Sequence, residues 1–119
     1  MTMSKKTRTE KGNCYELACK LFLRLANEGI EANLVHGFVR NPSGNTINHA
    51  WVELPSRNLV LDPSDIDPKT GKGTRYDLDD FYKRRRGKKQ AMYTNPLEVA
   101  SLVNSTKSWG PNKWIAKTR

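Results

Sequence analysis

The chain has little cysteine, few aromatic side chains and no long hydrophobic run. Two of its 119 residues are cysteine, 8% are aromatic and 36% are hydrophobic. Two cysteines five positions apart cannot cross-link a small secreted protein, and no cysteine or histidine group has the spacing of a zinc site. No stretch approaches the roughly 18 apolar residues of a membrane-spanning helix, and the first 13 residues lack the apolar stretch of a signal peptide. These absences predict a soluble protein of a reducing compartment, the cytoplasm, with no membrane span.

The length fits one domain, because a second domain would have too little chain for a hydrophobic core of its own. Residues 1–12 are polar and basic, and we expect a disordered or loosely attached arm there. Residues 13–119 then form the single domain, with a basic C-terminal part.

Positive charge is in excess, with 21 Lys and Arg against 12 Asp and Glu and a net charge of +9. Residues 14–76 are balanced, so the excess lies toward the two ends. Its densest part is the run 83–89, whose basic side chains are Lys83, Arg84, Arg85, Arg86, Lys88 and Lys89. Such a run indicates a contact for nucleic acid, an anionic surface or an acidic protein. The alternative is a solvated helix end, since aromatics are not interleaved with the run as in single-strand binders.

The first regular element that the sequence predicts is an amphipathic helix from about Cys14 to Asn27 or Glu28. Asn13 suits the N-cap, Glu16 completes a variant of the capping box, and Gly29 is a natural stop. The apolar residues gather on the Cys14 side of this helix. We therefore expect Cys14 at the N-terminus of the helix and on its buried side.

Alternating patterns predict strands over 31–39, 47–54 and 58–62, separated by turns over 41–45 and 55–57. A loop is expected over 63–73, a short helix over 77–85, a candidate fourth strand over 90–94 and a helix over 96–105. In the second strand His49 and Trp51 share one face. This order of elements predicts an α+β fold with an antiparallel sheet.

Three residues could carry chemistry together. A cysteine at a helix N-terminus lies at the positive end of the macrodipole, which favours the thiolate, and Cys14 is predicted there. A thiolate needs a partner, for which His49 is the candidate, and the imidazole needs an orienting acceptor, for which Asp62 is the candidate. A hairpin loop of two residues would put His49 and Asp62 directly opposite each other, and a loop of four would make them diagonal neighbours on the same face.

Each of these residues also has a plain structural interpretation. Cys14 could be a small core residue, His49 a hydrogen-bonded packing residue, and Asp62 the start of a turn. Cys19 lies about 140° from Cys14 around the helix and is interpreted as core. His36, on the first strand, is interpreted as structural. The segment 109–114, with a tryptophan at each end, is expected to dock against the sheet.

Four segments occur in a characteristic order. They are Gly12-Asn13-Cys14-Tyr15-Glu16-Leu17-Ala18, Gly29-Ile30-Glu31-Ala32 with Val35-x-Gly37-Phe38, His49-Ala50-Trp51-Val52-Glu53-Leu54, and Val60-Leu61-Asp62-Pro63. Together, over residues 12–63, they resemble the core of the transglutaminase-like superfamily. Its members include protein cross-linkers, deamidases, peptidases, peptide:N-glycanases and the leader peptidases of lasso-peptide pathways. The leader peptidases are similar to this chain in motif order and in small size.

The resemblance implies a papain-like, transglutaminase-like fold and a Cys-His-Asp triad. Cys14 would be the nucleophile, His49 the acid and base, and Asp62 its orienter, in acyl transfer from an amide through a thioester without metal or other cofactor. Tyr15 and Trp51 would line the substrate groove, with plain packing as the alternative for Trp51. The oxyanion donors would be the Cys14 backbone N–H and the Asn13 side chain, since only 13 residues precede Cys14.

Two hypotheses follow from these patterns. The first is a cysteine-dependent amide hydrolase or acyl transferase of the peptidase, deamidase or transglutaminase type, acting on a protein or peptide. The second is a catalytically idle domain of the same fold that binds nucleic acid or an acidic protein through the basic segment.

Overall fold

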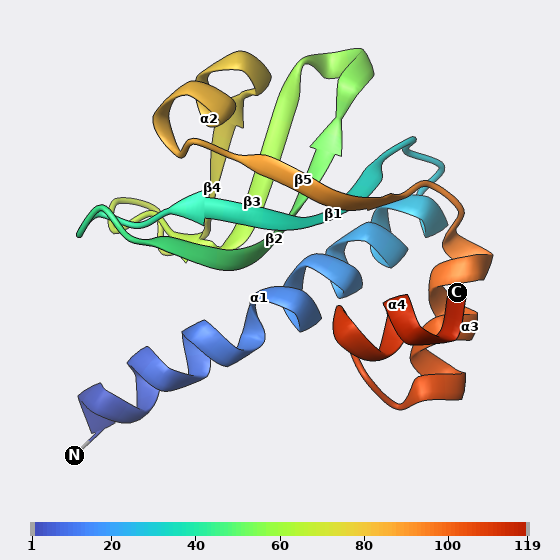
Figure 1. The fold of residues 1–119 in the computed structure, drawn as a ribbon. Coiled ribbons are helices and arrows are strands. Elements are labelled where there is room, and N and C mark those ends of the chain that lie inside the picture. Colours follow the sequence, from blue (N-terminus) through green and yellow to red (C-terminus); the bar gives the residue numbers. More distant parts are fainter. Residues whose placement is uncertain (1, 119) are drawn as a thin grey trace.

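The computed structural model describes residues 2–118, and the side chains of residues 14–115. A sheet forms its middle layer, with a long helix and two short ones on one face and a third short helix on the other (Figure 1). The elements in chain order are α1 (Thr2–Asn27), β1 (Asn33–Arg40), β2 (Thr46–Leu54), a 3-10 turn (Pro55–Arg57), β3 (Leu59–Ile66), β4 (Gly73–Asp77), α2 (Leu78–Arg84), β5 (Lys88–Tyr93), α3 (Pro96–Thr106) and α4 (Asn112–Thr118).

The sheet has the strand order β4-β3-β2-β1-β5, and all neighbouring strands are antiparallel. The predicted α+β fold with an antiparallel sheet is therefore confirmed. β1 and β2 pair along their whole length, whereas the pairing of β2 with β3 covers only the three residue pairs from Val52–Leu61 to Leu54–Leu59. Beyond Val52 and Leu61 these two strands separate, and the candidate site lies there.

Each face of the sheet has its own hydrophobic cluster, because successive residues of a strand point to opposite faces. Leu34 and Val52 face α1, α3 and α4, where Phe22 and Trp114 complete the larger cluster. The smaller cluster on the other face joins Val35, Val39, Trp51 and Val60 to Phe81 of α2. Burying both faces makes the sheet a rigid support for the polar side chains at its open seam.

The start of the first helix differs from the prediction. α1 begins at Thr2, so Asn13 is not its N-cap and Cys14 lies well inside the helix. The reason is that Lys, Arg and Glu, which dominate residues 5–11, are good helix formers, and a glycine such as Gly12 costs a helix only about 1 kcal/mol. The side chains of residues 1–13 lie outside the described ones, and a loosely attached arm over 1–12 stays a prediction.

The predicted loop over 63–73 is wrong in part. β3 continues through Pro63 to Ile66, and residues 73–77 form the unpredicted edge strand β4. The β3–β4 pairing is irregular between Asp62 and Ile66, where Pro63 has no N–H to donate. A Cβ on Gly73 would lie 2.7 Å from the Pro63 Cα, so the two strands approach closely only because residue 73 is glycine. Pro, Asp and Gly here bend a strand pair, while in the sequence they are typical of a loop.

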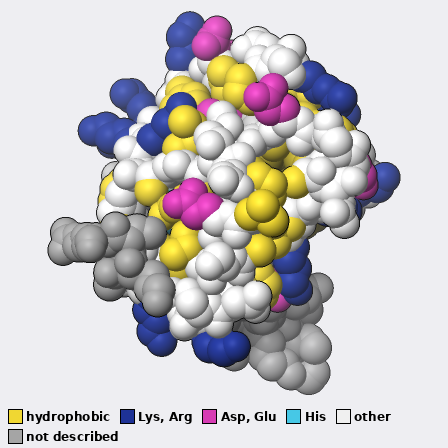
Figure 2. Space-filling model, turned by 90° about the vertical axis from the view of Figure 1, so that its right-hand side faces the viewer, with side chains coloured by type: hydrophobic (Ala, Val, Ile, Leu, Met, Phe, Trp, Pro, Cys, Tyr) yellow, Lys and Arg dark blue, Asp and Glu magenta, His cyan; other side chains and the backbone are white. Residues whose placement is uncertain are grey.

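The surface at the end of α1 is partly apolar. Figure 2 shows hydrophobic side chains gathered in the middle of the face seen from that side, with Lys and Arg at its margins. A shallow groove of about 280 Å³ lies between the end of α1 and the β5–α3 connection, lined in part by Phe22, Ile30 and Pro96. In the described part of the chain, no helix has both the length and the apolar character to cross a membrane.

Candidate active site

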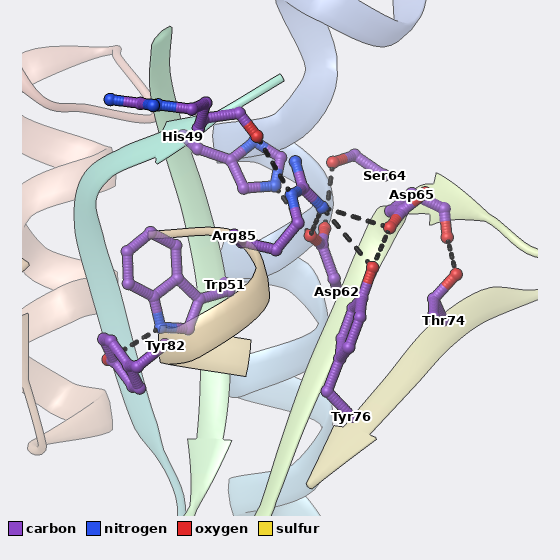
Figure 3. A network of polar contacts seen from close by, with 10 residues as sticks. His49, Trp51, Asp62, Ser64, Asp65, Thr74, Tyr76, Tyr82 and Arg85 are labelled. Atoms are coloured by element: carbon purple, nitrogen blue, oxygen red, sulfur yellow. Dashed lines mark hydrogen bonds and ion pairs between the residues drawn. The ribbon is translucent and has the colours of Figure 1, made fainter. Parts of the chain in front are cut away.

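His49 and Asp62 meet at the open seam between β2 and β3. Leu54 pairs with Leu59, so the connection has four residues, the second of the two loop lengths that put His49 and Asp62 on one face. His49 Nε2 lies 2.8 Å from Asp62 Oδ2 (Figure 3), and the two residues are only 7% and 0% exposed. The pair is thus a short hydrogen bond shielded from water.

Cys14 reaches the same imidazole from α1, which packs against both β2 and β3. Its side chain is 3% exposed, and its interaction with the imidazole raises the pKa of His49. Because the β2–β3 pairing ends at Val52 and Leu61, the seam has room for a side chain from the helix. The structure therefore brings Cys14, His49 and Asp62 together.

The electrostatics of His49 result from two opposing effects. Burial by itself lowers the pKa of the imidazole, because a charged ring loses its water. The interactions with Asp62 and Cys14 outweigh burial and raise the pKa of His49 to about 9. A pKa raised in this direction favours the imidazolium at neutral pH, the form that can give a proton to a leaving amine.

A second group of side chains holds Asp62 from behind. Ser64 Oγ donates to Asp62 Oδ1 at 3.1 Å, and Arg85 Nη1 lies 3.6 Å from Asp62 Oδ2. The same Arg85 nitrogen donates to Asp65 Oδ2 at 3.1 Å, and the Tyr76 hydroxyl donates to that oxygen as well (Figure 3). Both carboxylate oxygens of Asp62 are thus engaged, which fixes the orientation of the group that holds His49.

These contacts, in the order Cys14, His49, Asp62 along the chain, can be set beside known families. A family model of the transglutaminase-like superfamily matches residues 4–59 of the chain. The match confirms the resemblance seen in the sequence; it includes Cys14 and His49 and ends before Asp62. No curated protein and no solved structure matches the chain.

Trp51 lies beneath the candidate site and not along an open groove. The residue is 0% exposed, its ring is stacked on that of His49 at 6.2 Å between centroids, and Phe81 packs against it. Trp51 Nε1 donates to the Tyr82 hydroxyl at 3.2 Å, and that hydroxyl donates to Glu53. The packing interpretation therefore describes Trp51, and the predicted groove wall is corrected: a fully buried ring offers a substrate no surface.

Tyr15 packs against His36, and its place in a substrate groove stays a prediction. Its ring meets the edge of the His36 ring at 5.0 Å between centroids, and burial, with a smaller effect of Cys14, raises the pKa of its hydroxyl to about 12. His36 is fully buried among Tyr15, Tyr93 and Trp114, which agrees with the structural interpretation and with docking of the C-terminal segment. Cys19 is confirmed as core, and burial raises the pKa of its thiol to about 11.

Of the two expected oxyanion donors, the structure describes only the Cys14 backbone N–H. The Cys14 amide lies twelve residues beyond the first residue of α1, where amides bond to carbonyls one turn earlier, so the helix leaves this N–H no free proton for an oxyanion. The Asn13 side chain lies outside the described ones, and its role stays a prediction.

The six basic residues expected to face an acidic partner are divided by the structure. Lys83, Arg84, Arg86 and Lys88 are exposed. Arg85 turns inward to Asp62 and Asp65, with 18% of its side chain exposed. Lys89 forms an ion pair with Glu53 at 3.4 Å and lies over the Tyr82 ring.

Arg85 is the supporting residue that sequence reasoning assigned to the wrong group. A signal for it existed: Arg85 follows Phe81 by four positions, and residues so spaced share a helix face. Since Phe81 is the buried residue of α2, Arg85 had to point the same way. Among the described residues no three His, Cys, Asp or Glu side chains gather as potential metal ligands.

Proposed function

We propose that this protein is a cysteine-dependent amide hydrolase or acyl transferase acting on a protein or peptide. The observation that carries the proposal is the imidazole of His49, which is hydrogen-bonded to the Asp62 carboxylate at 2.8 Å and interacts with the Cys14 side chain. A nucleophile, a base within hydrogen-bond reach and a third group that orients the base are the parts of a cysteine acyl-transfer site. The partial match to the transglutaminase-like superfamily supports the same assignment.

The first half of the proposed reaction forms a thioester. The Cys14 sulfur, as the thiolate, attacks the carbonyl carbon of the amide. When the C–N bond breaks, the His49 imidazolium gives its proton to the departing amine, and the acyl group stays on sulfur. Asp62 holds the ring in place and stabilises its positive charge until the proton leaves.

The second half returns the thiolate and the imidazolium. His49, now neutral, takes a proton from water or from an acceptor amine, which attacks the thioester carbonyl as the C–S bond breaks. Water gives hydrolysis, as in a peptidase or deamidase, and an amine gives a cross-link, as in a transglutaminase. A thiol that works in this way must stay reduced, so a cytoplasmic location would suit the protein.

Access to the thiol is part of the mechanism. Cys14 and His49 are 3% and 7% exposed, so an amide reaches the sulfur only when neighbouring chain is displaced. We therefore expect reaction with small reagents to be faster than with bulky ones, and substrate binding to include a local opening.

The two cysteines provide the test, because both are buried in α1 and only one contacts His49. Wild type, Cys14→Ser and Cys19→Ser are each incubated with a cell lysate, and mass spectrometry follows cleavage, one-dalton deamidation and cross-linking. We expect Cys14→Ser to abolish these products and Cys19→Ser to keep them while losing about 1–3 kcal/mol of stability. Alkylation with iodoacetamide near neutral pH should label Cys14 before Cys19.

The opposite pattern would show that the nucleophile is wrongly assigned. If Cys14→Ser keeps all products, or if folded wild type forms none and its Cys14 is inert to iodoacetamide, the catalytic proposal fails. The alternative, a catalytically idle domain that binds nucleic acid or an acidic protein through its basic segment, would then be favoured.

A further inference from the structure

We propose that four basic side chains at one end of the sheet form a binding groove for the acidic side chains of a protein or peptide substrate. They are Arg40 of β1, Arg84 and Arg86 around the end of α2, and Lys88 of β5, and we call them the cationic groove. That the occupant is a substrate rests on the proposed function. That the groove binds acidic peptide is an independent claim.

Main-chain contacts bring these residues together from distant parts of the chain. The Arg40 N–H donates to the Arg85 carbonyl at 2.7 Å, which fastens the end of α2 to the end of β1. Lys88 pairs with Phe38 across the β1–β5 ladder, two positions from Arg40. The sheet register, and not the run of basic residues alone, therefore adds Arg40 to the group.

Two adjoining hollows lie between these side chains and share Arg40 as a wall. One, of about 420 Å³, is lined in part by Arg40, Arg84, Arg85 and Tyr76. The other, of about 450 Å³, lies among Phe38, Arg40, Thr46, Arg86 and Lys88. Each has the room for an amino acid side chain, and both combine cations with an aromatic ring.

The charge of the groove is unbalanced. Within the described part of the chain, no carboxylate forms an ion pair with Arg40, Arg84, Arg86 or Lys88, and all four residues are exposed. Asp65, the acidic residue that lines the first hollow, is neutralised by Arg85 at 3.1 Å. The local potential is therefore positive and favours an anionic occupant.

The backbone at the end of α2 determines where the Arg86 side chain lies. The φ of Arg86 is 53°, a left-handed conformation that glycine adopts at least cost, and glycine stands one position later, at residue 87. The Arg86 side chain lines the second hollow from this position. A left-handed residue is usual where a helix ends, and Lys107 has the same conformation at the end of α3.

The shape of the groove favours carboxylates on a peptide over the backbone of a nucleic acid. A nucleic acid would need cations tracking a strand and aromatic faces free for stacking bases. Here Phe38 is half-buried, and the Tyr76 ring packs against Phe81. Arg85 also connects the first hollow to Asp62, so a peptide in the groove would lie one side chain away from the proposed active site.

Direct binding tests the groove without depending on catalysis. A fluorescein-labelled peptide in which glutamates alternate with leucine and serine is titrated, by fluorescence anisotropy, with the Cys14→Ser protein so that it cannot be consumed. We expect the glutamate peptide to bind and its glutamine counterpart not to bind. Adding Arg40→Gln should raise the Kd about tenfold or more, because Arg40 lines both hollows. Arg40 contacts Arg85 through its own main-chain N–H and carbonyl oxygen, so this substitution leaves these contacts in place.

Lys83→Gln is the matched control. It also removes one positive charge, but Lys83 lines neither hollow. The Kd of this variant for the glutamate peptide should stay within about twofold of the unsubstituted value. Equal losses of affinity in Arg40→Gln and Lys83→Gln, or equal binding of the two peptides, would contradict the proposal that the cationic groove binds acidic peptide. A single-stranded oligothymidine that binds more tightly than the glutamate peptide, with the same loss on Arg40→Gln, would overturn the peptide assignment in favour of nucleic acid.

The outcomes of the two proposals are separable. If the peptide binds in the groove but Cys14 is inert, the proposed function fails and the binding site stands. If Cys14 forms acyl-transfer products and the glutamate peptide does not bind, only the groove fails. If both hold, Arg40→Gln should raise KM for glutamate-containing substrates and leave kcat unchanged, the pattern of lost binding that is equal in ground and transition states.

Discussion

His49 illustrates how much of the proposed chemistry depends on one contact. Burial alone would leave its ring neutral at pH 7, and the Asp62 and Cys14 contacts reverse this. The charge of the imidazole is therefore set by neighbours on two other elements, β3 and α1. An exposed histidine with the same sequence neighbours would titrate near 6.5 and would be a much poorer acid partner for a thiolate.

The contact can be tested with Asp62→Asn, which keeps the size of the side chain and removes its charge. We expect the pKa of His49, followed by NMR, to fall from about 9, because burial is then opposed by the Cys14 contact alone. The rate of amide turnover should fall by several orders of magnitude, about 10⁴-fold where the same change has been made in a serine protease triad. Ser64→Ala, which removes a hydrogen bond to the other oxygen of Asp62, is the control and should cost far less. An unchanged rate in Asp62→Asn would remove Asp62 from the mechanism.

At the scale of elements, α2 determines whether the support of the site is complete. The helix begins at an Asp77 N-cap, whose Oδ1 accepts from the Asp79 and Asp80 amides at 3.0 and 3.3 Å. Asn58, in the connection between β2 and β3, donates to the other Asp77 oxygen at 2.8 Å. The cap thus ties the start of α2 to the hairpin that carries His49 and Asp62, while the end of α2 supplies Arg85.

We expect Asp77→Ala to destabilise the protein by about 1–2 kcal/mol, the usual cost of losing a capping carboxylate. Because Arg85 closes the same short helix, amide turnover should decrease together with stability, although residue 77 does not touch the site. The measurements are urea unfolding and turnover at a temperature where the variant is folded. Asp79→Ala removes the same charge from the same turn without removing the cap, and a loss as large as that of Asp77→Ala would contradict the capping argument.

Elements with local signals were the ones that the sequence could predict. The strand 47–54, the helix over 77–85 with its acidic first turn and the helix after Pro96 all agree closely with β2, α2 and α3. β4 and the extension of β3 could not be predicted, because their pairing depends on the close approach of Gly73 to Pro63, which lie ten residues apart. The start of α1 was misplaced because a good local cap at Asn13 competes with helix-forming residues before it.

The residues of the candidate site also divide into those that local sequence patterns could predict and those that they could not. The spacing of His49 and Asp62 was enough to put them on one face, because strand periodicity is local and strict. The inward turn of Arg85 and the burial of Trp51 depend on which face of the sheet α2 covers. The face of the sheet that a helix covers depends on tertiary packing, which local sequence patterns indicate only weakly.

At the scale of the whole molecule, two buried histidines on β1 and β2 give stability opposite dependences on pH. Burial lowers the pKa of His36 to about 4, and neither of its ring nitrogens has a hydrogen-bond partner among the described residues. Between about pH 6.5 and 4 the unfolded chain therefore binds a proton at His36 that the folded chain does not bind. The free energy of unfolding falls as pH drops through this range. The pKa of His49 is raised to about 9, so its contribution is complete below about 6.5 and is lost as pH rises toward 9.

We therefore expect the free energy of unfolding, measured by urea titration, to be greatest near pH 6.5. His36→Phe should flatten the acidic limb of this curve, and Asp62→Asn the alkaline limb, whatever either substitution does to the absolute value. A maximum that stays in place with both limbs intact in these variants would mean that other groups dominate the titration.

Arg85 also connects segments that are distant from one another in the sequence. Through this one residue the end of β1, the turn of β3 at Asp62 and Asp65, the edge strand at Tyr76 and the end of α2 are fastened at a single point. Small secreted proteins close such loops with disulfides. Here a guanidinium closes them, by contacts that break and re-form without an oxidant. Both cysteines, Cys14 and Cys19, keep free thiols in this arrangement.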